Sequence, residues 1–220
     1  MKKILFYLML ALSVATTASM MTACGDDKEE PKKETPTDPT DPTATTDTVI
    51  VINGVKWATR NVDEPGTFAA TPESAGKFYQ WNKKVAWSAT GSVSGWSDTA
   101  AAGTTWEKAN DPSPVGWRVP TTEEQRTLLD AAKVTSEWTT QNGVSGRKFT
   151  DKTTNNSLFL PASGNWGNNG KLHGAGTSGC YWSSTQYNER NACSLDIISD
   201  VAGIYDAYRW VGFSVRAVAE

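Results

Sequence analysis

Apolar and polar positions divide this chain into three zones. Residues 4–15 form an almost unbroken apolar run, whereas residues 25–47 contain no apolar residue larger than Ala or Pro. From Thr48 onward, short apolar segments alternate with turns rich in Gly, Asn, Ser and Thr. Such alternation is typical of β-strands separated by turns. We therefore expect one folded domain, residues 48–220, preceded by two segments that stay outside its core.

Residues 1–23 have the layout of a secretory signal peptide, with Lys2 and Lys3 before the apolar run. That run is much shorter than the roughly 20 residues that span a bilayer. Its end, Met21-Thr22-Ala23-Cys24, resembles the lipobox of bacterial lipoproteins, with Met21 in place of the usual Leu. The resemblance implies that Cys24 becomes the lipidated first residue of an outer-membrane, cell-surface lipoprotein. The alternative is a secreted protein with an incidental cysteine.

Residues 24–47 read as a lipidated cysteine followed by a disordered linker. Acidic and basic residues come first, and a Thr-Pro-Asp repeat follows from Thr35 to Pro42. This composition cannot bury enough apolar surface to offset chain entropy. At about 3 Å per residue, the linker would hold the domain roughly 50–70 Å from the lipid. The early acidic residues resemble surface-export signals of Bacteroidetes lipoproteins, and the alternative is solvated linker charge.

The folded zone carries two strong local signals. Asn53-Gly54 lies between the β-rich segments 49–52 and 55–59, and Asn-Gly in that context predicts a type I′ hairpin. Thr121 and Glu124 form a capping box, which predicts a helix from residue 121 to about Lys133. A second short helix is expected near residues 72–81. The segments 147–150, 157–160, 180–184, 192–197 and 212–218 are expected to be strands, so the predicted class is α+β.

Charge and cysteine content limit the partners. Without Lys2 and Lys3, 19 basic residues face 24 acidic ones, a net charge of −5. Because no basic block exists outside the signal, we expect no nucleic-acid partner. Cys180 and Cys193 flank a predicted turn around Tyr187-Asn188, and in an oxidising compartment they either form a cross-strand disulfide or remain buried thiols. Nothing in the sequence fixes the oligomeric state.

Several short segments together resemble a known family. In chain order they are 54–62, 77–81, 114–121, 158–162, 181–185 and 212–216, which include Lys56-Trp57-Ala58-Thr59, Gly116-Trp117-Arg118-Val119-Pro120 and Gly212-Phe213-Ser214-Val215-Arg216. They look like the Fibrobacter succinogenes major paralogous domain, common in lipoproteins of Bacteroidetes. More distantly, residues 117–121 and 211–216 resemble the formylglycine-generating sulfatase-modifying family. That resemblance implies a C-type-lectin-like fold with paired terminal strands.

The residues that carry most enzyme chemistry are sparse. The chain has one histidine, His173, in a Gly-flanked segment, and it lacks a Gly-x-Ser-x-Gly motif. One His and widely spaced Cys do not fit a zinc site, and the lectin-like resemblance lacks the calcium motifs. Asp196, Asp200 and Asp206 match no calcium loop. We therefore expect no cofactor, no metal and no catalysis.

The Gly- and Asn-rich segment near residue 166 is the candidate ligand site. Its members are Asn165, Trp166, Asn168, Asn169 and His173. An indole beside amide groups suits a sugar ring, since it offers an apolar face next to hydrogen-bonding groups. The alternative is that Trp166 packs inward and pins the loop. We expect a non-catalytic binding module for a polysaccharide or a protein; the rival interpretation is a structural subunit of a surface assembly.

Overall fold

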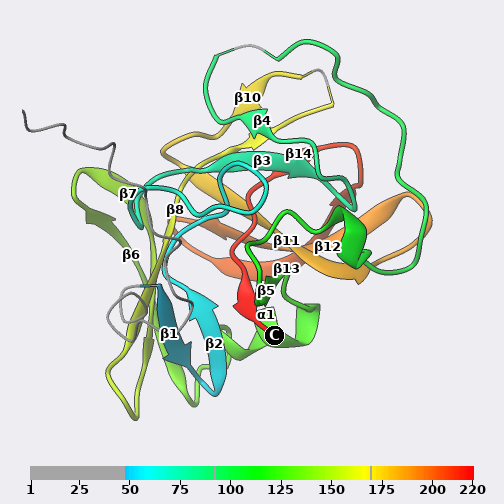
Figure 1. The fold of residues 1–220 in the computed structure, drawn as a ribbon. Helices are drawn as coiled ribbons and strands as arrows, with labels where there is room; N and C mark the ends of the chain where they lie inside the picture. Colours follow the sequence, from blue (N-terminus) through cyan, green and yellow to red (C-terminus); the bar gives the residue numbers. More distant parts are fainter. Residues whose placement is uncertain (1–47, 92, 169) are drawn as a thin grey trace, which may run out of the picture. The chain divides into compact units, whose positions relative to one another are not determined.

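The computed structural model describes residues 48–91, 93–168 and 170–220 (Figure 1). The predicted signal peptide, the lipidation site at Cys24 and the linker lie outside the described residues. Within the described part, strands dominate, accompanied by one α-helix, α1 (Thr122–Thr127), and one 3-10 turn, Lys108–Asn110. No helix in this part is long and apolar enough to cross a membrane.

The predicted α+β, C-type-lectin-like class is wrong, because the strands form a nearly all-antiparallel, sandwich-like fold. The capping box at Thr121 and Glu124 is confirmed, but α1 has six residues. The Asp130 carboxylate accepts a hydrogen bond from the Ala132 N–H (3.0 Å). Such a local bond offers the backbone an alternative to the helix, and the chain turns there into the next strand.

The helix predicted near residues 72–81 is also wrong. Gly76 has a φ of +68°, and a Cβ there would lie 2.3 Å from the Val62 carbonyl oxygen. That backbone conformation cannot continue a right-handed helix. The residues that follow form strand β3 (Lys77–Gln80), which buries Phe78 and Tyr79.

The first and last strands of the described domain meet in a four-stranded antiparallel sheet. Its order is β1 (Val49–Ile52), β2 (Val55–Ala58), β15 (Val218–Ala219) and β5 (Trp117–Arg118). Asn53 and Gly54 both have positive φ, 45° and 82°, which confirms the predicted hairpin. Val218 pairs with Trp57 on one side and with Arg118 on the other, so the expected pairing of terminal strands is present.

Three further sheets complete the domain (Figure 1). The five-stranded sheet has the order β10 (Leu172–His173), β9 (Asn165–Trp166), β14 (Gly212–Phe213), β3 and β4 (Trp87–Ser88). One three-stranded sheet consists of β11 (Ser178–Gln186), β12 (Asn191–Ile198) and β13 (Ala202–Tyr208). The other consists of β6 (Val134–Gln141), β7 (Val144–Asp151) and β8 (Ser157–Pro161).

Two apolar cores lie on opposite faces of the β11–β12 hairpin. Side chains alternate between the faces of a strand. Trp182 therefore enters the core that contains Phe213, while its neighbour Tyr181 enters the core that contains Leu195 and Phe149. Both tyrosine and tryptophan are almost fully buried. This central hairpin thus connects the two halves of the domain.

Candidate functional site

A cleft of about 470 Å³ opens on the surface of the described domain. Its wall comes from β5, from the segment before it and from the chain end after β15. The cleft is lined by Lys84, Thr105, Trp106, Lys108, Asp111, Ser113, Pro114, Val115, Gly116, Trp117, Arg118, Val119, Thr121, Ser184 and Glu220. Indole, hydroxyl and charged groups therefore share one concave surface, which is the usual make-up of a ligand site.

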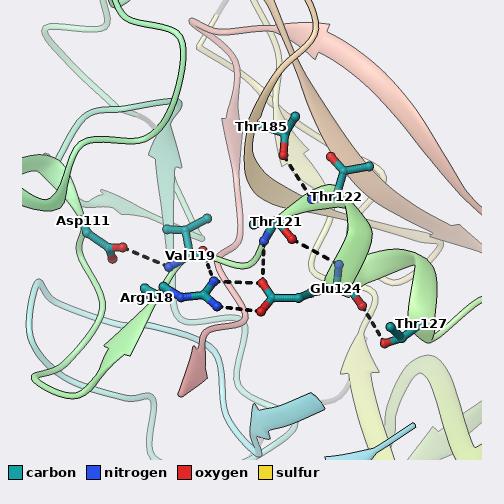
Figure 2. A network of polar contacts seen from close by, with 8 residues as sticks. All are labelled: Asp111, Arg118, Val119, Thr121, Thr122, Glu124, Thr127 and Thr185. Carbon is teal, nitrogen blue, oxygen red and sulfur yellow. Dashed lines mark hydrogen bonds and ion pairs between the residues drawn. The ribbon is translucent and has the colours of Figure 1, made fainter. Parts of the chain in front are cut away.

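A network of hydrogen bonds fixes one wall of the cleft (Figure 2). Arg118 donates from Nη1 and Nη2 to the two carboxylate oxygens of Glu124, at 2.8 and 2.6 Å. Glu124 also accepts from the Thr121 N–H, and Thr121 Oγ1 accepts from the Glu124 N–H. The capping box that begins α1 therefore also orients the arginine of β5.

These contacts shift the pKa values of both partners. The hydrogen bond to Glu124 raises the pKa of Arg118 above its ordinary value, against the effect of burial. Burial acts to raise the pKa of Glu124, but the hydrogen bonds from Arg118 and Thr121 outweigh it and hold that pKa below its ordinary value. Glu124 therefore stays ionised and hydrogen-bonded. Such a carboxylate is suited to orienting Arg118 and not to transferring a proton.

The other acidic groups of the cleft are engaged too. Asp111 accepts from the Ser113 N–H through Oδ1 (2.8 Å) and from the Val119 N–H through Oδ2 (2.9 Å). Glu220 forms an ion pair with Lys108 at 2.9 Å. Val115, at the tip of the Pro114–Trp117 turn, is fully exposed, and Lys84 is exposed as well. The cleft therefore offers an apolar tip, a lysine and the half-buried indole of Trp117 to a ligand.

The structure describes four of the five predicted ligand residues, and these four differ in how exposed they are. Trp166 is almost fully buried, its Nε1 donates to the Ser88 carbonyl (2.7 Å), and its ring packs near Trp96. Trp166 thus follows the inward alternative, because strand β9 directs it into the sheet interior. Asn165 is half-buried opposite the exposed His173 in the β9–β10 pair, Asn168 is exposed, and Asn169 lies outside the described residues.

Asn168 contacts an aromatic pair that was not among the predicted site residues. Its Oδ1 accepts a hydrogen bond from Trp210 Nε1 at 3.1 Å. Trp210 stacks on Tyr208, with ring centroids 4.4 Å apart and an interplanar angle of 9°. The sequence signal was Tyr208-Arg209-Trp210, two aromatic residues flanking an arginine just before the last strands. No pattern along the chain, however, connects this segment with Asn168.

Cys180 and Cys193 are free in the structure, and strand register explains why. Cys180 lies opposite Asp196, three residues beyond Cys193, while Cys193 faces Asp206 on β13. Three residues along a strand span roughly 10 Å, which exceeds the ~7 Å limit for bridging two Cα atoms. The disulfide considered from sequence therefore does not form in this arrangement.

Cys180 instead lies beside the half-buried carboxylate of Asp196. Burial raises the pKa of Asp196 to about 6, although hydrogen bonds from Ser194 and Cys180 act to lower it. Burial and the nearby Asp196 raise the pKa of Cys180 well above its ordinary value. The thiol is therefore kept protonated and unreactive. Among the described residues, no three His, Cys, Asp or Glu side chains are grouped to hold a metal ion.

Asp196 predicts a specific pH dependence of stability. Its folded pKa of about 6 exceeds its ordinary 3.8, so the folded chain binds more protons between these values and loses stability as the pH rises through them. Asp196→Asn removes this loss. We expect the variant to gain about 1–3 kcal/mol over wild type at pH 7.5 and much less at pH 4. Urea unfolding at both pH values measures the difference. A variant no more stable than wild type at pH 7.5 would contradict it.

Comparison with known proteins identifies the class to which this β-rich domain belongs. The Fibrobacter succinogenes major domain matches residues 19–219. The chain belongs to this family, as the segments from residue 54 to residue 216 indicated. Neither the curated proteins nor the solved structures gave a match, so the more distant similarity to sulfatase-modifying enzymes has no support there.

Proposed function

We propose that this protein is a non-catalytic binding module, anchored by lipid to the outer membrane and exposed at the cell surface, with a polysaccharide or a protein as its ligand. The observation that carries the proposal is the 470 Å³ cleft, whose acidic groups are all held in hydrogen bonds or ion pairs. A rigid concave surface of this composition suits recognition. Family membership supports the domain's identity and leaves the ligand open.

An enzyme would need a group free to move a proton at the cleft. A general base lies within hydrogen-bonding reach of the atom it deprotonates. Asp111 is occupied by two backbone N–H groups and Glu220 by Lys108. His173, the chain's only histidine, does not line the cleft. These features favour binding over catalysis.

The binding experiment uses the full chain, purified in detergent, against a glycan array and against outer-membrane protein extracts. Val115→Glu places a charge on the fully exposed apolar tip of the cleft, and we expect it to weaken binding at least tenfold. Val85→Glu is the matched control, because Val85 is also an exposed valine but does not line the cleft. Absence of binding to both panels at high micromolar concentration would refute the proposed function.

The proposed lipid anchor, which rests on Cys24 and the lipobox-like residues before it, is tested separately. Cells that express the full chain and grow with labelled palmitate are expected to label it and to retain it in the membrane fraction. Cys24→Ala should abolish the label and release the protein, since stable attachment needs the acyl chains. An unlabelled wild-type chain in the medium would disprove anchoring.

A structural subunit of a surface assembly is the second candidate, because of strand β13. This strand lies at the edge of its sheet and carries the exposed Tyr205 and Tyr208. A long apolar edge strand is a template for pairing with another chain. Sedimentation of the full chain in detergent, combined with crosslinking on intact cells, separates the candidates. A monomer in both experiments would remove the assembly role.

A further inference from the structure

The Tyr208–Trp210 pair forms a flat, layered aromatic surface at the end of β13. Trp210 packs against the apolar core that contains Trp182 and Phe213. Tyr208 lies on Trp210 at a nearly parallel angle of 9° and remains 43% exposed. The order from inside to outside is therefore core, indole, phenol ring, solvent. One face of Tyr208 is covered by Trp210, so its exposed area comes from the opposite face and the ring edge.

Hydrogen bonds from neighbouring segments fix the backbone that carries both rings. Gln80 donates from Nε2 to the Trp210 carbonyl oxygen (2.7 Å). Arg209 lies between the two aromatic residues in the sequence. Its N–H donates to the Arg190 carbonyl and its carbonyl accepts from the Trp81 N–H, both at 2.9 Å. These bonds fix the turn before any ligand arrives. A preorganised surface loses little conformational entropy on binding.

The polar edge of this surface comes from Asn168. Its Oδ1 accepts a hydrogen bond from Trp210 Nε1. This bond fixes which end of the amide faces the indole nitrogen, so Nδ2 is at the end that faces away from it. Arg209, by contrast, turns its guanidinium inward, where it bonds to the carbonyl oxygens of Ala101 and Gly103 at 2.9 Å. The surface thus combines an aromatic face with a neutral amide, while the arginine of the same turn is not available to an anion.

We propose that Tyr208, Trp210 and Asn168 form a second binding site, which takes a pyranose ring of a neutral polysaccharide. The face of an aromatic ring is electronegative, and the C–H groups on one face of a pyranose carry the complementary partial charge. The Asn168 amide supplies hydrogen bonds to sugar hydroxyls beside that contact. The inference rests on the proposed binding function. It adds a second site, distinct from the cleft, and names the class of ligand that this site takes.

The test is affinity electrophoresis of the full chain, in non-ionic detergent, through gels that contain β-glucan, xylan, α-mannan or dextran. We expect at least one of these neutral polysaccharides to retard wild type. Tyr208→Ala should weaken the retardation at least tenfold, and Tyr208→Phe should retain it within about twofold because the ring face remains. Asn168→Ala should weaken it several-fold through loss of the amide.

Tyr205→Ala is the matched control. Tyr205 lies on the same strand and is 51% exposed, but residues three apart point to opposite faces of a strand. It should leave retardation unchanged, and a thermal melt of each variant shows that the fold persists. Retardation that Tyr208→Ala does not alter would overturn this second site and leave the proposed function standing. Wild type that none of the four polysaccharides retards would overturn the sugar-binding inference, and binding of proteins alone in the extract experiment would then identify the ligand as a protein.

Discussion

Arg209→Ala is expected to lower the free energy of unfolding by about 3–5 kcal/mol. Arg209 is almost fully buried, and its guanidinium bonds to five acceptors on two segments, 101–103 and 186–191. They are the carbonyl oxygens of Ala101, Gly103, Asn188 and Asn191, and Gln186 Oε1. It also lies over the Trp81 ring, 4.3 Å from the centroid. Alanine would leave these acceptors unpaired and open a cavity under the Tyr208–Trp210 turn.

Arg209→Lys separates geometry from charge at this position. A lysine retains the charge but cannot reproduce the planar fork that reaches several carbonyl groups at once. We therefore expect an intermediate loss of about 2–3 kcal/mol. Equilibrium unfolding in guanidinium chloride measures both variants against wild type. An Arg209→Ala variant within 1 kcal/mol of wild type would show that the arginine does not hold these segments together.

Trp182→Ala is expected to cost about 3–5 kcal/mol, the range for removing a large aromatic side chain from a core. Trp182 is fully buried and stacks on Phe213 with centroids 4.3 Å apart. Its Nε1 donates to the Tyr79 carbonyl oxygen at 2.7 Å. The same residue connects backbones, since its N–H donates to the Ser214 carbonyl (3.0 Å). Truncation therefore removes packing where β11, β14 and β3 meet.

Trp182→Phe keeps an aromatic ring but removes the indole donor to the Tyr79 carbonyl. Its expected cost is about 1–3 kcal/mol. Tyr187→Ala serves as the control, because Tyr187 is largely exposed, and its effect should stay within about 0.5 kcal/mol. Chemical unfolding of the three variants checks the order. A Trp182→Ala variant as stable as Tyr187→Ala would contradict this description of the core.

Local signals in the sequence predicted local structure well. Asn-Gly at residues 53–54 gave the first hairpin, because the turn needs two positive φ angles in a row. The capping box at Thr121 and Glu124 gave the start of α1, because it satisfies orphan N–H groups within one turn. A second Asn-Gly pair, Asn142-Gly143, adopts the same positive angles between β6 and β7. This pair is the same hairpin signal, although strand β6 was not among the predicted strands.

The predicted fold class was wrong because it depended on the lengths of the helices and on the long-range pairing of the strands. Leu128 and Leu129 continue a helical apolar pattern, yet the helix ends at Thr127 and the chain turns at Asp130. Tertiary contacts override propensity in such short segments. The C-type-lectin-like class came from a resemblance of a few motifs, while membership of the major domain family, which the same motifs indicated, is confirmed.

The candidate site could be predicted only in fragments. Trp166 in an Asn- and Gly-rich segment has the same local sequence whether it points outward or inward, and the β9–β14 pairing directs it inward. Asn168 was proposed from its own segment, but its partner Trp210 lies 42 residues further along the chain. The cleft also combines residues from distant segments, from Lys84 to Glu220. Only the three-dimensional arrangement brings such groups together.

Fluorine NMR of the full chain labelled with 5-fluorotryptophan tests most directly whether this domain recognises a ligand at its surface. Each indole reports on its own place, and the addition of a polysaccharide that retards the protein should shift the Trp210 signal. The signals of Trp57 and Trp182, both buried in the cores, should stay where they are. Saturating polysaccharide that moves neither the Trp210 signal nor those of Trp106 and Trp117 in the cleft would contradict the account.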